Sequence, residues 1–317
     1  MTHLLQRHLP ILFVVCCMMG CGSCGNPPAK QAPTQPPPAP FTMPEIPAMI
    51  REPEQQATWL LTHYWDNFNF SDTAYIHLPN ILEQAFVNYI ITLPYAKQKE
   101  REQSVKNTLT KAEKEETGRM YEYFLELFDK YLYDPNSPYR NDEFYLPVVA
   151  YILADQRTDS LEKTRSEYRL GMILKNRLGE VASDFVYTLP SKKTGRLYGI
   201  KTDYTILMFY NPDCNACAQI MEELKASPFV SMMMSNKTLS ILAFYPDEDT
   251  KTWEKHIPDI PKNWINAYDK GTIIKRDELY DLKAIPTLYL LDKDKKVLLK
   301  DADFPVIENW LQQIPPR

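Results

Sequence analysis

Glycine is scarce in this chain, which has 9 Gly among its 317 residues against 26 Pro. No Gly-rich phosphate loop and no nicotinamide or flavin fingerprint occurs, so no nucleotide cofactor is expected. A basic excess is also missing: the formal net charge is −5, which argues against a dedicated nucleic-acid binder. Apolar runs of the roughly 20 residues that a membrane-spanning helix needs are absent as well. The chain does contain 44% hydrophobic residues, and this content over 317 residues indicates about two folded domains.

Cysteine is present but concentrated in two places. Four of the six Cys lie within the first 24 residues, and the other two are Cys214 and Cys217. A disulfide framework across a large fold needs cysteines that are spread along the chain. Each cluster is therefore expected to serve a local purpose.

The first 20 residues have the pattern of a bacterial signal peptide. A basic start without acidic residues precedes nine consecutive apolar residues, Ile11–Met19, a run too short to span a membrane. The run leads to Gly20 and Cys21, and a small residue directly before a Cys resembles the lipobox of bacterial lipoproteins. The resemblance implies that residues 1–20 are removed and that Cys21 carries the lipid. The alternative is an ordinary cleaved signal with incidental cysteines.

A proline-rich segment follows the predicted lipidation site. Cys21 and Cys24 have CxxC spacing, but lipidation of Cys21 would block its thiol, so neither a redox nor a zinc role is expected for this pair. Between residues 26 and 47 the chain is mostly Pro, Ala, Gln and Thr. At the polyproline rise of about 3.1 Å per residue, about twenty residues would hold the next domain roughly 60 Å from the membrane. Plain disorder is the alternative, and in either case residues 21–41 are predicted to be a tether.

Residues 42–175 show helical periodicity and predict an all-helical domain. One apolar stripe at helical spacing consists of Met120, Phe124, Leu127, Phe128 and Tyr131. Between Tyr131 and Asp142, two prolines and a set of Tyr, Asn, Asp and Arg side chains interrupt the pattern. A structural turn capped by Asp134, Asn136 and Ser137 is the favoured interpretation, and a binding loop is the alternative.

From residue 176 to residue 317 the pattern changes to short, nearly continuous apolar runs. Tyr204–Tyr210 and Leu239–Tyr245 have the composition of parallel strands that are buried on both faces. A helical segment between them completes a strand–helix–strand unit. The segment 287–300 predicts a hairpin, and a final helix is expected over Val306–Gln313. The fold class is therefore α/β, with a central mixed sheet flanked by helices.

The remaining two cysteines lie where the first of these strands gives way to a helix. Free N–H groups and about half a positive charge at a helix N-terminus stabilise a thiolate, so Cys214, the one expected to be more exposed, would be the nucleophile. Cys217 lies nearly one turn further on, where it would attack a mixed disulfide formed at Cys214. A structural disulfide is the alternative, although closing so short a loop removes little entropy from the unfolded chain.

A proline motif further along the chain supports the redox interpretation. Ile285–Thr287 stands at the start of a later predicted strand, and a CxxC at a strand end followed by such a motif resembles the thioredoxin superfamily. The resemblance implies that Pro286 is a cis-proline, which faces the CxxC and aligns a substrate backbone. Gly179–Phe185 resembles the entry motif of the membrane-anchored TlpA/ResA branch, with Ser183 in place of the usual Pro. Residues 42–175 resemble a helical domain of undefined function that precedes thioredoxin modules in bacterial lipoproteins.

Several residues depart from the pattern of the superfamily. Asp213 replaces the usual Trp before the nucleophile, and an adjacent carboxylate opposes thiolate formation. Met208 takes the strand position where classical thioredoxins bury a proton-relaying aspartate, so the relay is either absent or supplied by another carboxylate. His256 is interpreted as an exposed helix-end side chain, with a base near the site as the alternative. Asp247–Asp249 is interpreted as a helix N-terminal cluster, with a metal role as the alternative.

The sequence therefore predicts a lipid-anchored thiol–disulfide oxidoreductase outside the cytoplasm, in a bacterial periplasm. Cys214 would be the nucleophile, Cys217 the resolving cysteine and Pro286 the substrate-aligning residue, without a metal or cofactor. The expected partners are client proteins with thiols or disulfides, a redox partner protein and the membrane, through the lipid on Cys21. The helical region would recruit or orient the client, while the redox direction and the oligomeric state stay open. The alternative is a binding or scaffolding lipoprotein whose thioredoxin-like module has little redox activity.

Overall fold

The computed structural model describes residues 40–314. The predicted signal segment, the candidate lipidation site Cys21 and nearly all of the predicted tether lie outside the described residues. Pro38–Arg317 forms one compact unit. Within the described residues, no helix combines the length and the apolar character needed to cross a membrane. The structure therefore bears on the two predicted folded regions, one helical and one α/β.

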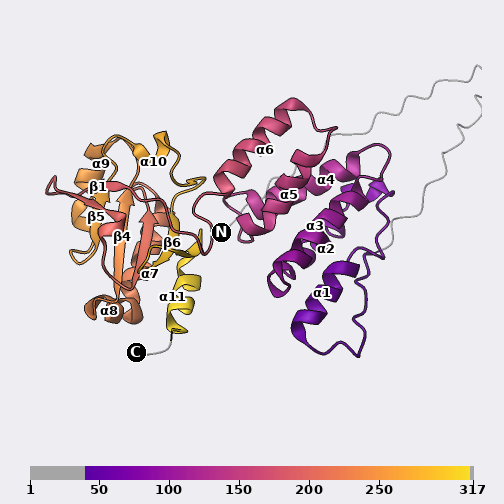
Figure 1. Ribbon diagram of the computed structural model, residues 1–317, viewed down its shortest axis with the longest axis horizontal. Helices are drawn as coiled ribbons and strands as arrows, with labels where there is room; N and C mark the ends of the chain where they lie inside the picture. The colour runs from indigo at the N-terminus through magenta and orange to yellow at the C-terminus, as the bar shows by residue number, and fades with distance from the viewer. Residues whose placement is uncertain (1–39, 315–317) are drawn as a thin grey trace, which may run out of the picture. The chain divides into compact units, whose positions relative to one another are not determined.

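The first part of the described chain is helical, as predicted, and runs from indigo to magenta in Figure 1. Its α-helices are α1 (Pro53–His63), α2 (Leu82–Ile90), α3 (Gln98–Ala112), α4 (Arg119–Phe128), α5 (Asp142–Ala154) and α6 (Ser160–Ile173). Aromatic rings dominate the core between them. Phe124 meets Trp65 edge-on with ring centroids 5.2 Å apart, and Phe86 meets Phe128 edge-on at 4.8 Å. Such pairs add about 0.5–1.5 kcal/mol each to the stabilisation that burial provides.

The predicted apolar stripe is confirmed along α4, but the residues that follow α4 no longer keep its spacing. Met120, Phe124, Leu127 and Phe128 are all buried. The next buried residue is Leu132, whereas Tyr131, which the spacing placed on the stripe, is only partly buried. The reason is that Asp129–Tyr133 forms a π-helical turn, whose extra residue rotates the following side chains relative to an α-helix.

The segment after this π-helical turn is a structural turn, which is the interpretation that the sequence favours over a binding loop. The Asp134 Oδ1 atom accepts a hydrogen bond from the Asn136 backbone N–H at 2.8 Å, and the Ser137 hydroxyl donates to the Tyr131 carbonyl at 2.6 Å. Asn141 then caps α5, because its side chain accepts from the Phe144 N–H at 3.1 Å. These contacts close the turn and set the direction in which α5 leaves it.

A mixed seven-stranded sheet forms the second part, in the order β2-β1-β5-β4-β3-β6-β7. The strands are β1 (Val186–Thr188), β2 (Thr194–Arg196), β3 (Tyr204–Phe209), β4 (Leu239–Tyr245), β5 (Ile265–Tyr268), β6 (Thr287–Asp292) and β7 (Val297–Lys300). β3, β4 and β5 are parallel, whereas β6 pairs antiparallel with β3 and with β7. The two predicted parallel strands and the predicted hairpin are therefore confirmed.

Helices cover both faces of this sheet, as predicted (Figure 1). α7 (Asn215–Ala226), α8 (Pro228–Ser235), α9 (Thr250–Lys255) and α11 (Phe304–Gln312) pack on the face that carries Ile206 and Met208 of β3. α10 (Ile273–Arg276) and the chain that leads into β1 pack on the face that carries Leu207 and Phe209. Because successive strand residues point to opposite faces, β3 is buried from both sides, which explains its continuous apolar run.

Candidate active site

The CxxC segment lies between the end of β3 and the first turn of α7. Asn211 shapes the connection, because its carbonyl accepts from the Cys214 N–H at 3.1 Å and its side-chain oxygen accepts from the Asp213 N–H at 3.0 Å. The Asn211 amide in turn donates to the Asp247 carboxylate at 2.9 Å, which ties the turn to the chain after β4. The turn is therefore held by two hydrogen bonds of its own and by one to the chain after β4.

Cys214 is the N-cap residue of α7. Its Sγ atom accepts from the Cys217 N–H at 3.2 Å, in the place where a Ser or Asp oxygen usually caps a helix. The Cys214 thiol also donates to the carbonyl of Ile285, with the sulfur and oxygen 3.4 Å apart. The Ile285–Pro286 peptide bond is cis. The structure thus brings together Cys214, Cys217 and Pro286, the three site residues that the sequence predicts within the described chain.

The two cysteines differ sharply in their environment. Cys214 is partly exposed and Cys217 is fully buried, and both are free cysteines. Burial raises the pKa of the Cys217 thiol, and its interaction with Cys214 raises it further. Cys217 is therefore a neutral thiol in this state, while Cys214 has the helix N-terminus beside it and access from solvent.

A buried polar triad lies behind the cysteines. The Tyr210 hydroxyl and the Trp253 indole N–H both donate to the Asn266 Oδ1 atom, at 3.1 and 3.0 Å. Burial raises the Tyr210 pKa, so this hydroxyl stays protonated. Met208 is fully buried among apolar residues on the same face of the sheet. The triad, which the sequence analysis missed, is therefore a network of neutral groups behind the dithiol.

A pocket of about 300 Å³ opens beside α7. It is lined by residues of three segments, among them Tyr210, Pro212, Met221, His256 and Ile260. His256 lies at the end of α9, as interpreted from the sequence, with its Nδ1 atom 2.8 Å from Asp259 and its Nε2 atom 4.0 Å from Asp213. The pocket thus combines apolar walls with a rim of mixed charge, to which Glu222, Lys225 and Asp259 contribute beside His256.

Two of the acidic residues after β4, Asp247 and Asp249, have structural partners. Asp249 caps α9 by accepting from the N–H groups of Lys251 and Thr252, which agrees with the favoured interpretation of a helix N-terminal cluster. Asp247 pairs with Lys275 and with Asn211. Among residues 40–314 there is no group of three or more His, Cys, Asp or Glu side chains arranged to hold a metal ion.

The strand order, the CxxC at a helix N-terminus and the facing cis-proline define a thioredoxin-like fold. A family profile described as "Thioredoxin-like" matches residues 202–297, and one described as "Domain of unknown function (DUF5106)" matches residues 21–176. The solved structure of a thioredoxin-like protein from Bacteroides caccae ATCC 43185 is 47% identical, covers 86% of this chain and 98% of its own chain, and has a TM-score of 0.81. The chain belongs to the thioredoxin-like proteins, with a helical DUF5106 domain ahead of the thioredoxin-like region.

Two further relatives cover the thioredoxin-like region. The thiol-disulfide oxidoreductase ResA of Bacillus cereus is 28% identical over 148 residues, which are 45% of this chain and 81% of that protein. The solved C-terminal domain of an uncharacterized protein from Bacteroides fragilis NCTC 9343 is 51% identical over 44% of this chain and 99% of its own, with a TM-score of 0.43. Through its similarity to ResA, the thioredoxin-like region is related to thiol-disulfide oxidoreductases.

Proposed function

We propose that this protein is a thiol–disulfide oxidoreductase that uses Cys214 and Cys217 as a redox-active dithiol. The observation that carries the proposal is the asymmetry of the pair: an accessible Sγ atom caps α7 beside a cis-proline, and a buried thiol lies one helical turn behind it. A structural disulfide needs no such difference in access. The relationship to ResA supports the same chemistry.

In the reducing direction, the Cys214 thiolate attacks one sulfur of a client disulfide. A mixed disulfide forms, and the second client sulfur leaves as a thiolate. Cys217 then loses its proton and attacks the Cys214 sulfur, which releases the first client sulfur and leaves a Cys214–Cys217 disulfide. The client gains two electrons and the protein loses two, so a dithiol partner protein must reduce the pair before the next cycle. The oxidising direction is the reverse of these steps.

Trapping of the mixed disulfide tests this proposal. In the full chain carrying Cys217→Ser, the second step is blocked, so Cys214 should accumulate disulfide adducts with client proteins after acid quenching of cells. The matched control is the Cys214→Ser/Cys217→Ser double variant, which has no thiol at the site. The purified wild-type chain should also catalyse reduction of insulin disulfides by dithiothreitol, and Cys214→Ser should not. Adducts no more abundant than in the control, together with no catalysis, would instead favour the binding or scaffolding alternative.

The proposal includes a lipid anchor at Cys21 and a site of action outside the cytoplasm, in a bacterial periplasm. It is supported by the apolar run of nine residues, by Gly20 directly before Cys21 and by the proline-rich stretch that follows. The full chain expressed in a lipoprotein-processing bacterium should partition with membranes and carry an acyl modification at Cys21 by mass spectrometry. Cys21→Ser should abolish both properties. An unmodified Cys21 in the mature wild-type chain would refute the anchor without touching the redox proposal.

A further inference from the structure

The segment that carries the cis-proline has little regular structure of its own. Between the end of α10 at Arg276 and the start of β6 at Thr287, the backbone forms turns and bends. Its last residue precedes Thr287, which the β3–β6 ladder holds opposite Phe209, and side-chain contacts adjust the position of the residues before it. We call residues 277–286 the proline loop. Its last residues, Ile285 and Pro286, face Cys214.

The helical domain and the chain after it supply several of these contacts. Lys175 pairs with Glu278 at 3.4 Å, and the Asn176 amide donates to the Leu279 carbonyl at 2.8 Å. Within α5, the Asp142 Oδ1 atom lies 3.0 Å from the Lys283 Nζ atom. Lys283 is three positions before Pro286, so this ion pair is the contact of α5 that reaches nearest to the cis-proline along the loop.

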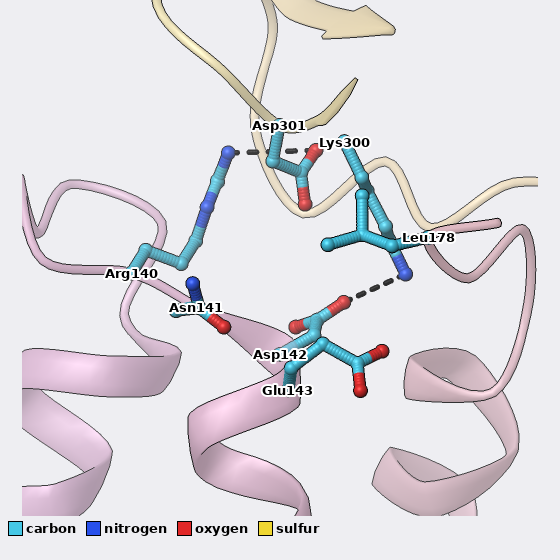
Figure 2. A pocket seen from close by; sticks show the side chains of 7 residues that line it. All are labelled: Arg140, Asn141, Asp142, Glu143, Leu178, Lys300 and Asp301. Atoms are coloured by element: carbon cyan, nitrogen blue, oxygen red, sulfur yellow. Dashed lines mark ion pairs between the residues drawn. The ribbon is translucent and has the colours of Figure 1, made fainter. Parts of the chain in front are cut away.

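The Asp142 carboxylate is buried within a network of charges. Its second oxygen lies 2.7 Å from the Lys300 Nζ atom at the end of β7, and Lys283 also pairs with Asp281 at 2.9 Å. Lys283 lies over the ring of Tyr133, 4.1 Å from its centroid. Figure 2 shows Asp142 at the start of α5 directed at Lys300, with the neighbouring Arg140–Asp301 pair.

The burial and the charges of this network favour a single arrangement of its side chains. The side chains of Asp142 and Lys300 are each 6% exposed, and that of Lys283 is 11% exposed. Burial disfavours the Asp142 carboxylate, but Lys300 and Lys283 outweigh burial and lower its pKa. A buried charge that loses its partner is strongly unfavourable, whereas an exposed pair is exchanged for water at little cost. The Asp142–Lys283 distance is therefore held more tightly than a surface ion pair would hold it.

We propose that Asp142 of the helical domain is a positioning residue for the thioredoxin-like site, because it fixes Lys283 and thereby the distance between the Ile285 carbonyl and Cys214. This inference rests on the proposed function in one respect, namely that Cys214 is the attacking nucleophile. It assigns the helical domain a task that the thioredoxin-like region does not perform alone: setting the reactivity of Cys214 through the proline loop.

The direction of the effect follows from the hydrogen bond at Cys214. The Ile285 carbonyl accepts from the neutral thiol and points its negative end at the sulfur, so it disfavours the thiolate. When the loop is released, Cys214 should become more reactive towards a small reagent. A protein disulfide should react more slowly, because its backbone has to be aligned by the same loop.

The test is alkylation of both cysteines in the reduced full chain by iodoacetamide, followed from pH 5 to pH 9. With Asp142→Asn or Lys283→Met, Cys214 alkylation at pH 7 should rise roughly threefold, the change expected for one neutral hydrogen bond. Its rate profile should move to lower pH, and Cys217 should stay slow. The matched control is Glu143→Gln, which breaks the ion pair of the next α5 residue with Arg177 and leaves the proline loop untouched.

The double variant Asp142→Asn/Lys283→Met should behave like either single variant, since both break the same link. Cys214 rates equal to those of the Glu143→Gln control would overturn the inference. Equal acceleration at Cys217 would also overturn it, because it indicates general loosening of the fold. Additive effects in the double variant would show that the two residues act separately, which contradicts the proposed link. Alkylation requires no redox turnover, so a wild-type chain that reduces no disulfide refutes the proposed function and leaves this test intact.

Discussion

The sulfur of Cys214 lies 3.4 Å from the backbone oxygen of Ile285, which is 71 positions further along the chain. The sheet brings the two residues together, because β3 and β6 pair antiparallel with Phe209 opposite Thr287. One strand ends where the other begins, so the turn after β3 and the loop before β6 meet at the same edge. The contact is thus a consequence of strand register, and the side-chain hydrogen bonds of each loop refine it.

We expect the two cysteines to be alkylated at very different rates. In the reduced full chain at pH 7, iodoacetamide should modify Cys214 roughly 100-fold faster than Cys217, because Cys217 is buried and its raised pKa leaves little thiolate. Quenched time points analysed by peptide mass spectrometry measure both rates. Cys217 should stay slow in Cys214→Ser, since burial, the larger cause of its raised pKa, remains. Similar rates at the two positions would contradict the assignment of attacking and resolving roles.

The charge next to the nucleophile should have a smaller effect. Asp213→Asn removes a carboxylate that opposes the Cys214 thiolate, but the Asp213 side chain is 73% exposed, so water screens it. We expect a two- to threefold increase in Cys214 alkylation at pH 7 that shrinks in 1 M salt, by analogy with other exposed charges. Asp294→Asn is the control, since Asp294 is exposed in the turn at the other end of β6. A decrease in rate for Asp213→Asn would mean that Asp213 supports the site instead.

Features that depend on local pattern could be predicted from the sequence. β3 and β4 are continuous apolar runs because both faces of each strand are covered, and the CxxC position follows from the strand-to-helix junction. β5 could not be found in this way, because it is short and contains the buried polar residue Asn266. The reason for an Asn there is its contact with Tyr210 and Trp253, which arrive from other elements.

The contact between the helical domain and the proline loop likewise joins residues that are far apart in the sequence. In the sequence, Asp142 is the last residue of the predicted turn, and no residue near it indicates an ion-pair partner. Lys283 is 141 positions away and lies between Leu282 and Ala284, where no pattern indicates an ion pair. Only the packing of α5 against the proline loop turns these two surface-like residues into a buried ion pair. Periodicity predicts elements, whereas such pairs depend on how the elements meet.

The buried triad behind the dithiol should contribute measurably to stability. Asn266→Ala removes the acceptor of two buried donors, the Tyr210 hydroxyl and the Trp253 indole N–H. Leaving them unpaired should lower the free energy of unfolding by about 2–4 kcal/mol, measured by urea titration of the full chain. Asn263→Ala, at an exposed position two residues before β5, should change it by less than about 0.5 kcal/mol. A similar small change in both variants would show that water replaces the Asn266 contacts.

The pH dependence of stability should carry a signature of Asp301, which follows β7 and faces Arg140. Burial raises the pKa of Asp301 from 3.8 to about 6, although Arg140 partly opposes this. Between about pH 4 and pH 6 the folded chain therefore binds more protons at this site than the unfolded chain, so the Asp301 contribution to stability falls as the pH rises. From pH 4.5 to pH 7.5, the wild-type chain should lose about 2 kcal/mol more of its free energy of unfolding than Asp301→Asn does. Asp303→Asn, at an exposed position, should retain the wild-type slope. If the curves of the wild-type chain and Asp301→Asn stay parallel across this range, the buried carboxylate is not the group that titrates.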